Sequence, residues 1–177
     1  KIELITGAVI LPWNNPLRVV EQALQLDILS EGRLILGMGR GAARREFKSF
    51  GVELADSREM FDESCKIIMD GPRPFKSFKD RTIMVSMSPS SVEVAANYGL
   101  KTLRFSQGDW RNAIPEIEHY RAKFLELHGR TAPPFMISDF VLCFPTKAEV
   151  TAHCDKYFAK MFETVANHYE FMSPHFK

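Results

Sequence analysis

The sequence predicts an α/β fold in which helices wrap a parallel β-sheet. Apolar, β-rich segments alternate with segments of helical periodicity, which is typical of parallel strands joined by crossover helices. The β-rich segments are hydrophobic nearly throughout, as expected of strands that are covered on both faces. This pattern alone does not distinguish an open, doubly wound sheet from a closed (β/α)8 barrel.

The elements follow one another in a regular order. The predicted strands span residues 2–11, 33–38, 81–87, 100–106 and 135–144. The predicted helices span residues 16–32, 55–71, 89–99, 110–129 and 146–172. The positions at helical spacing that are expected to face the core are Leu17, Val20, Leu24, Asp27 or Ile28, Phe61, Cys65, Ile68, Ile117, Tyr120 or Arg121, and Phe124.

Composition excludes several classes of protein. Lys and Arg number 23 against 22 Asp and Glu, a formal charge of +1, which argues against a nucleic-acid partner. No apolar run approaches the roughly 20 residues of a membrane span, so no membrane partner is expected. Cys65, Cys143 and Cys154 have no CxxC spacing, which predicts reduced, buried thiols and a cytoplasmic location. No residue set predicts a metal site.

Both ends of the sequence look cut, because Lys1 leads directly into a strand and Lys177 follows no clear stop signal. The segment after the helix over 55–71 passes abruptly into a Pro-rich connection. With 177 residues, enough for one substantial core, we expect residues 1–177 to be a single domain. We also expect flanking segments, and an internal loop near Gly71, to be missing from this sequence.

A glycine-rich stretch, LILGMGRGAARREF at residues 34–47, raises the question of a dinucleotide-binding loop. Such a loop opens into an amphipathic helix and has an acidic residue at the end of the next strand. Here the following segment is polar and broken by Gly51, and the acidic residue near the right distance, Asp56, begins a helix. We therefore reject the dinucleotide interpretation.

The three glycines of this stretch (Gly37, Gly39 and Gly41) still require an explanation. At the carboxyl end of a parallel strand, glycines let the backbone approach a flat ligand and free Arg40 to point over the strand ends. The alternative is a tight strand exit with a solvated Arg40.

Two further features indicate a phosphate. Ser88 occupies a predicted N-cap with Pro89 behind it, and small residues there leave backbone N–H groups open to an anion. Arg58 lies in the first turn of its helix, where a cation opposes the helix dipole unless an anion is present. The alternatives are a plain capped helix and pairing of Arg58 with a nearby carboxylate, from Asp56, Glu59 or Asp62.

In combination these stretches resemble the bacterial luciferase-like flavin-dependent monooxygenase family. The ordered set is LP..NPLR, then LD.LS.GR...G.GRG, then EF..FG.....SR..F.E, within residues 6–68. The resemblance resumes at VSMSPSSVEVAANYGL, residues 85–100, and fades beyond them. It implies a (β/α)8 barrel, present here as an incomplete stretch, that binds FMN at the carboxyl ends of its strands.

The resemblance also implies roles for individual residues. Arg58 corresponds to a phosphate-binding arginine, with Ser88 and Ser91 as further phosphate contacts. Gly7–Ala8 matches the position where family members have a non-prolyl cis peptide bond beneath the flavin ring. Arg40 matches a catalytic residue near the reactive edge of that ring. The implied cofactor-binding residues are Gly7, Ala8, Arg40, Arg58, Met87, Ser88 and Ser91.

The activity that the resemblance implies is monooxygenation of a small, mainly apolar organic substrate. Members accept reduced FMN from a separate flavin reductase and react it with O2, and a homodimer is expected. Trp13 and Asn15 are the implied substrate-pocket residues, with ordinary packing the alternative for Trp13. The five histidines are expected on surface helices or at the terminus, because none follows a strand; they are His119, His128, His153, His168 and His175.

Two other functions stay open at this point. Related enzymes of the same fold use a deazaflavin for hydride transfer, and they share the arginine and the glycine loop. A non-catalytic flavin-binding protein on a shortened barrel is the second alternative, because the chain is short for the family.

Overall fold

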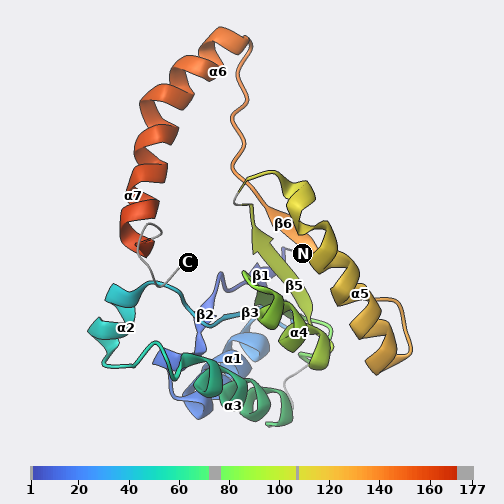
Figure 1. Cartoon of the computed structure of the whole chain (residues 1–177). Coiled ribbons are helices and arrows are strands. Elements are labelled where there is room, and N and C mark those ends of the chain that lie inside the picture. Colours follow the sequence, from blue (N-terminus) through green and yellow to red (C-terminus); the bar gives the residue numbers. More distant parts are fainter. Residues whose placement is uncertain (1, 72–76, 107, 171–177) are drawn as a thin grey trace. The chain divides into compact units, whose positions relative to one another are not determined.

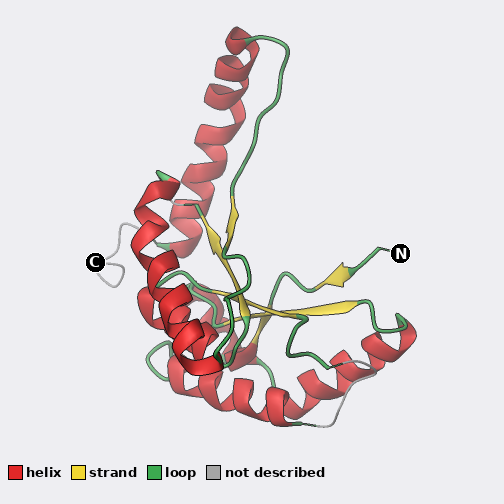
Figure 2. Cartoon of the chain, turned by 90° about the vertical axis from the view of Figure 1, so that its right-hand side faces the viewer, coloured by secondary structure: helices red, strands yellow, loops and turns green. Residues whose placement is uncertain are grey.

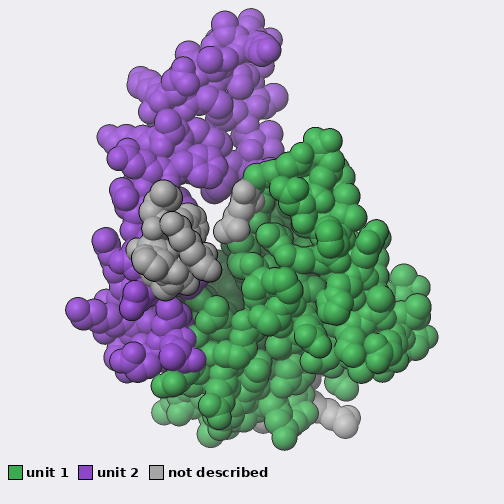
Figure 3. Space-filling model, in the orientation of Figure 1, with its two compact units in different colours: residues 1–41, 56–138 green, residues 42–55, 139–177 purple. Residues whose placement is uncertain are grey.

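The computed structural model describes residues 2–71, 77–106 and 108–170, and Figure 1 shows the order of its elements. The internal loop expected near Gly71 falls on residues 72–76, outside the described residues. Two compact units make up the chain: residues 1–41 with 56–138, and residues 42–55 with 139–177 (Figure 3). Each unit is described separately below.

The first unit contains one parallel sheet. Its strands are β1 (Leu4–Ile5), β2 (Val9–Ile10), β3 (Leu34–Gly39), β4 (Thr82–Val85), β5 (Lys101–Phe105) and β6 (Met136–Ser138). Their order is β1-β3-β4-β5-β6, with β2 also beside β3, and every pair is parallel. A doubly wound sheet reverses its strand order at a switch point, and this one does not. The described strands therefore follow the winding of a barrel.

Right-handed crossovers between strands in sequential order place every connecting helix on the same face of the sheet. Figure 2 shows the helices of this unit along one side of the strands. These helices are η1 (Leu11–Trp13), α1 (Pro16–Leu29), α3 (Ser57–Asp70), α4 (Pro89–Asn97), η2 (Trp110–Ala113) and α5 (Ile114–His128). The core lies between them and the sheet, where Leu36 and Met38 of β3 are buried with Phe61 of α3.

The predicted core positions are correct for α3 and partly correct for α5, where Ile117 is only half-buried, and for α1. Phe61, Cys65 and Ile68 are buried, as are Tyr120 and Phe124. In α1, however, Leu17 and Ile28 are exposed, and the buried side chains are Val19, Val20, Ala23 and Asp27. The buried stripe of α1 is therefore rotated by one position from the one that hydrophobicity alone suggests.

Asp27 replaces an apolar residue in that stripe because it has a partly buried ion-pair partner. Arg81, just before β4, binds both Asp27 carboxylate oxygens at 2.6 and 3.2 Å and also donates to the carbonyl of Gly32. Its guanidinium lies 5.0 Å from the centre of the Phe78 ring. This ion pair joins the end of α1 to the amino ends of β3 and β4.

The first predicted strand, residues 2–11, is interrupted and less buried than expected. Ile5 pairs with Ile35, and Val9 pairs with Met38. Between these two pairs the first strand advances by four residues while β3 advances by three. One extra residue therefore bulges between β1 and β2. The outer part is not covered on both faces as predicted, because Leu4 and Ile5 are 41% and 56% exposed.

The second unit is helical and departs from the predicted pattern in two places. Its helices are α2 (Arg44–Phe50), α6 (Lys147–His153), a π-helical segment η3 (Cys154–Phe158) and α7 (Ala159–Tyr169). No helix was predicted at α2, which Gly51 ends in a left-handed conformation at φ 68°. The predicted strand 135–144 is shortened to Met136–Ser138, and Phe140 beyond it contacts the rings of Phe158 and Phe162.

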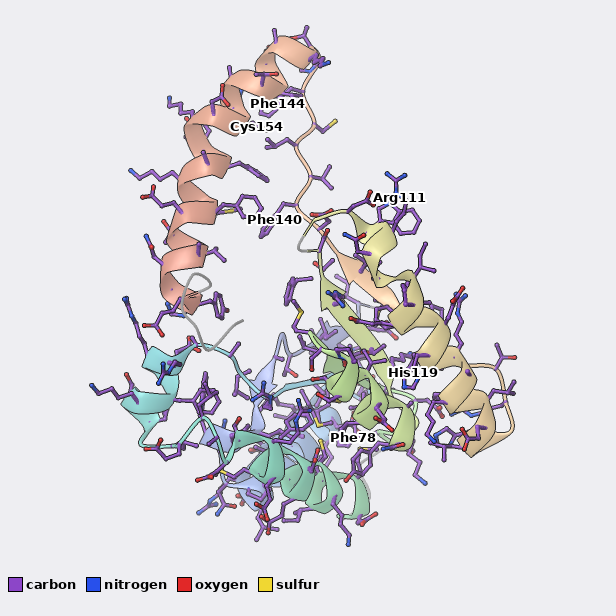
Figure 4. The ribbon with its side chains drawn as sticks, viewed as in Figure 1. Phe78, Arg111, His119, Phe140, Phe144 and Cys154 are labelled. Carbon is purple, nitrogen blue, oxygen red and sulfur yellow. The ribbon has the colours of Figure 1, made fainter. Side chains whose placement is uncertain are left out.

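Aromatic contacts hold the segment after β6 against the helices of the second unit. The ring of Phe140 lies 5.8 Å from that of Phe158, edge on, and Phe144 stacks on His153 at 4.1 Å. Figure 4 labels Phe140 and Phe144 on this extended segment. Cys143, between them, is exposed, and Cys154 is half-buried, so burial was predicted correctly for Cys65 alone.

Candidate functional site

The predicted cofactor-binding residues lie in the first unit, at the carboxyl ends of its strands. Arg40 directly follows β3, and Met87 and Ser88 follow β4. Arg58 lies in the first turn of α3. Because parallel strands end at the same edge of a sheet, residues far apart in the sequence meet there.

Ser88 caps α4, as the sequence predicts. Its backbone is extended, its side chain accepts a hydrogen bond from the backbone N–H of Ser91 at 3.3 Å, and Pro89 occupies the first helical position. The Ser88 hydroxyl also lies 3.1 Å from that of Ser90 and 2.9 Å from that of Ser91. Three hydroxyl groups therefore gather at the positive end of the α4 dipole.

Arg58 joins this hydroxyl cluster across 32 residues of sequence. Its Nη2 donates to Ser90 Oγ at 2.9 Å, and its Nη1 lies 3.5 Å from Ser91 Oγ. Ser90 was not among the predicted site residues, although the SPSS run that contains it was the signal that could have identified it.

Arg58 has no carboxylate partner among the described residues, so the alternative of pairing with Asp56, Glu59 or Asp62 is not realised. Asp62, one helical turn further along α3, retains a buried Oδ1 with no hydrogen-bond partner in the described part of the chain. Arg58 therefore turns from the nearest acid on its own helix toward the start of α4.

Arg40 lies beside Arg58. Its Nη1 donates to Ser57 Oγ at 2.7 Å, and Ser57 precedes Arg58 at the start of α3. Burial lowers the pKa of Arg40, and the positive charge of Arg58 lowers it further. Two neighbouring cations with hydroxyl partners form a site that fits an anion. Because this anion site lies at a helix start, a phosphate group suits it.

The peptide bond between Gly7 and Ala8 is cis, as the resemblance implies. It lies within the bulge between β1 and β2, next to Gly39 of β3: a Cβ on Gly39 would lie 3.6 Å from the Ala8 Cβ. The bulge therefore brings Gly7 and Ala8 to the same strand ends as Arg40.

Two of the three glycines in residues 34–47 are explained by the backbone itself. A Cβ on Gly37 would lie 1.9 Å from the Thr6 carbonyl oxygen, whereas the Thr6 hydroxyl accepts from the Gly37 N–H at 2.8 Å. Gly41 has φ 83°, a left-handed conformation that glycine adopts readily. Close strand packing and a tight exit therefore account for part of the motif without a ligand.

The other predicted residues have partners within the protein. The Asn15 side chain caps α1 by accepting from the N–H groups of Leu17 and Arg18 at 3.0 and 3.4 Å. Trp13 ends η1 and is half-buried. The Met87 sulfur accepts from the Phe105 N–H at 3.4 Å. None of the three lines either of two cavities found among the described residues, one lined by Arg104, Trp110 and Ile137 and the other between α4 and α5.

The four described histidines lie on helices that contribute no residue to this site. His119 and His128 belong to α5, His153 ends α6 and His168 belongs to α7, while His175 lies outside the described residues (Figure 4 labels His119). In residues 2–71, 77–106 and 108–170, no three His, Cys, Asp or Glu side chains group as metal ligands do. None of the described helices is long and apolar enough to cross a membrane.

Comparison with known proteins identifies relatives of this chain. The family model of luciferase-like monooxygenases matches residues 1–176. The 4-hydroxyprotoasukamycin monooxygenase of Streptomyces nodosus subsp. asukaensis is 29% identical over 166 residues, which cover 74% of this chain and 43% of that protein. The chain thus spans less than half the length of this relative.

Solved structures show the same fold. Monooxygenase RslO1 from Streptomyces bottropensis superposes with a TM-score of 0.82 at 20% identity, over 96% of this chain and 59% of that one. The oxygenating constituent of 3,6-diketocamphane monooxygenase from Pseudomonas putida, solved with FMN, gives 0.72 at 17% identity, over 94% and 58%.

A third structure belongs to a different reaction class. The coenzyme F420-dependent tetrahydromethanopterin reductase of Methanopyrus kandleri gives a TM-score of 0.55 at 20% identity, over 80% of this chain and 50% of that one. The incomplete luciferase-like α/β barrel predicted from the sequence is confirmed by these likenesses. Because the family model matches almost the whole of this chain, the chain belongs to the luciferase-like monooxygenase family.

Proposed function

We propose that the protein is an FMN-dependent monooxygenase that uses reduced flavin and O2 to oxygenate a small, mainly apolar organic substrate. The observation that carries this proposal is the meeting of Arg58 with the hydroxyl cluster at the start of α4. A monophosphate such as that of FMN is an anion that accepts hydrogen bonds on three oxygens. Two guanidinium groups, serine hydroxyls and a helix N-terminus are suitable donors for it.

The residues divide into two groups on this proposal. Arg58, Ser88 and Ser91 hold the phosphate, and Met87 lies where the chain enters their loop. Gly7 and Ala8 form the floor beneath the ring, where a backbone without large side chains permits close approach. Bound reduced FMN supplies the electrons for O2 activation, while the protein fixes its position and keeps water from the ring.

Arg40 is the residue whose role the geometry refines. The resemblance implies a position near the reactive edge of the ring, yet the side chain lies within the electrostatic reach of Arg58 and is hydrogen-bonded to Ser57. We therefore propose that Arg40 contributes its charge to phosphate binding, and that any stabilisation of negative charge on reduced flavin comes from the same guanidinium.

The remaining parts of the proposal come from the family. Trp13 and Asn15 are proposed to border the substrate, a separate reductase to supply reduced FMN, and a second copy of the chain to complete a homodimer. A cytoplasmic location accompanies them, because the three cysteines carry no disulfide in the described structure.

Equilibrium titration of the purified protein tests the cofactor. FMN and riboflavin have the same ring and differ in the phosphate, so the ratio of their dissociation constants isolates the phosphate site. We expect FMN to bind at least about 10-fold more tightly than riboflavin, which is the lower end for hydrogen bonds to a charged group. Equal affinities would contradict the phosphate assignment. Consumption of O2 with reduced FMN and an organic substrate then tests monooxygenation, and its absence would favour a non-catalytic flavin-binding protein.

A deazaflavin-dependent oxidoreductase is the second candidate function. The structural likeness to the coenzyme F420-dependent reductase supports it, although less strongly than the likeness to the two monooxygenases. Mass spectrometry and absorbance of the copurifying cofactor distinguish the candidates directly. Anaerobic hydride transfer with deazaflavin, together with no turnover of reduced FMN in air, would replace the first proposal with the second.

A further inference from the structure

A chain of buried hydroxyl groups lies beneath the start of α4. The Thr102 hydroxyl of β5 has two acceptors within reach, the nearer being Ser86 Oγ at 2.7 Å and the other the Met84 carbonyl at 3.2 Å. Ser86 Oγ in turn donates to the Ser91 carbonyl oxygen at 3.4 Å. Thr102 and Ser86 are both fully buried, at 0% exposure. Neither residue belongs to the proposed phosphate site, and no sequence pattern singles them out.

Strand pairing fixes the positions of Thr102 and Ser86, the first two residues of this series of hydroxyl groups. Thr102 stands opposite Met84 in the parallel register of β4 and β5. The Ser86 N–H donates to the Leu103 carbonyl at 2.8 Å, which continues the pairing beyond the end of β4. The two hydroxyls therefore belong to the rigid sheet, whereas Ser91 belongs to the first turn of α4.

Ser91 is consequently held from both sides. Its N–H donates to the Ser88 carbonyl at 3.0 Å, and its carbonyl accepts from Ser86. Its side chain lies 2.9 Å from Ser88 Oγ and 3.5 Å from Arg58 Nη1. A shift of the Ser91 backbone would thus move the hydroxyl that faces Arg58.

We infer that Thr102 and Ser86 are positioning residues that fix the first turn of α4 so that its hydroxyl groups and N–H groups meet a phosphate. The inference rests on the proposed function, since it assigns these residues to the phosphate site. Buried hydroxyl networks stabilise one arrangement strongly, because each member lacks water as an alternative partner.

Thr82 provides a matched control within the same sheet. It is also a threonine with 0% exposure, and it lies on the neighbouring strand β4. Its hydroxyl, however, donates to the Phe78 carbonyl at 2.8 Å, at the amino end of the strand and away from α4. Thr82→Val and Thr102→Val therefore remove equivalent buried hydroxyls, of which only one leads to the proposed phosphate site.

The test compares FMN and riboflavin affinities of Thr102→Val, Thr102→Ser, Ser86→Ala, Thr82→Val and Arg58→Ala proteins. Loss of one buried hydrogen bond predicts that Thr102→Val and Ser86→Ala weaken FMN binding by about 3- to 10-fold and leave riboflavin binding unchanged. Thr102→Ser retains the hydroxyl and is expected within about 2-fold of the unsubstituted protein. Thr82→Val is expected to leave the affinity ratio unchanged.

Three outcomes would overturn the inference: an unchanged FMN-to-riboflavin ratio in Thr102→Val or Ser86→Ala, an equal change in Thr82→Val, or no rescue by Thr102→Ser. If Thr102→Val does not fold, Ser86→Ala provides the same test with a smaller change in the core. Arg58→Ala separates this inference from the proposed function. If the FMN-to-riboflavin affinity ratio falls in Arg58→Ala but not in the Thr102 and Ser86 variants, only the inference is contradicted. If the ratio does not change in Arg58→Ala, the proposed phosphate site itself is contradicted.

Discussion

Arginines at the two ends of the same sheet have different kinds of partners. At the amino ends of β3 and β4, Arg81 binds both carboxylate oxygens of the fully buried Asp27. At the carboxyl ends, Arg40 and Arg58 are hydrogen-bonded to serine hydroxyls and have no carboxylate partner among the described residues. The first arginine is neutralised within the protein, whereas the other two leave positive charge available to a ligand.

This difference indicates which arginine belongs to the fold and which to function. An ion pair that is closed within the protein stabilises the folded state, since removing one partner leaves an uncompensated charge. Arg40 and Arg58 are neighbouring cations, and the pKa of Arg40 is lowered by burial and, to a smaller extent, by the positive charge of Arg58. Such a pair is stabilised when an anion binds between the two groups.

The largest expected effect is on the amino-end pair. Arg81→Ala removes the guanidinium that binds both carboxylate oxygens of the buried Asp27, and we expect a loss of about 3–5 kcal/mol in the free energy of unfolding. Chemical denaturation measures this loss. Arg18→Ala is the control, because the Arg18–Glu21 pair is solvent-exposed on α1, and its removal is expected to leave the free energy of unfolding nearly unchanged. Equal losses in the two variants would contradict the structural role of Arg81.

The next effect separates binding from stability at the carboxyl end. Arg40→Ala removes a cation that repels Arg58, so we expect unfolding to change by less than about 1 kcal/mol while FMN binding weakens by roughly 1.5–3 kcal/mol. Titration with FMN and with riboflavin distinguishes the two possible roles of Arg40. A loss confined to FMN supports phosphate binding, whereas equal losses for both ligands would place Arg40 at the ring instead.

The pH dependence of stability reports on the core beneath the site. Burial, and secondarily the charge of Asp62, raise the pKa of Cys65 from 9.0 to about 12. Burial also raises the pKa of Tyr120 from 10.0 to about 12, against the opposing charge of Arg130. As pH rises, the unfolded chain therefore loses these protons before the folded chain does.

Stability is accordingly expected to be insensitive to these two groups below about pH 9 and to fall as pH rises from about 9 toward about 12. Urea unfolding curves recorded across this range test the prediction. The Cys65→Ser protein should lose less stability over the same interval. An unchanged slope in that variant would show that Cys65 does not contribute.

The last prediction changes no residue and concerns only which thiol reacts with a labelling reagent. Cys65 is buried in α3, the helix that starts at the proposed phosphate site, whereas Cys143 is exposed. Because the thiolate is the reactive form, a maleimide at pH 7 should label Cys143 and leave Cys65 unmodified in the folded protein. Peptide mapping identifies the labelled residue. Labelling of Cys65 under native conditions would mean that α3 opens readily.

Local signals in the sequence predicted the parts of the site that depend on neighbouring residues. The cap formed by Ser88 follows from the S-P pair at a helix start. The position of Arg58 in a first helical turn follows from the periodicity of Phe61, Cys65 and Ile68. The cis bond at Gly7–Ala8 came from the family resemblance and is confirmed, but no spacing rule predicted it.

Features that depend on long-range contacts were missed. Asp27 occupies an apolar stripe because of an arginine 54 residues away, and Thr102 reaches Ser86 only through strand pairing. The interruption of the first strand arises from a register difference against β3, which a run of apolar letters does not encode. Hydrophobic periodicity identifies helices and strands, but it does not predict the strand register that brings particular side chains together.

The central claim is that the cluster around Arg58 binds a phosphate. Its most direct test is the ratio of FMN to riboflavin affinity in the Arg58→Ala protein compared with the unsubstituted one. We predict that FMN binding weakens by roughly 1.5–3 kcal/mol, with riboflavin binding and the free energy of unfolding unchanged. FMN affinity equal to that of the unsubstituted protein would contradict the assignment.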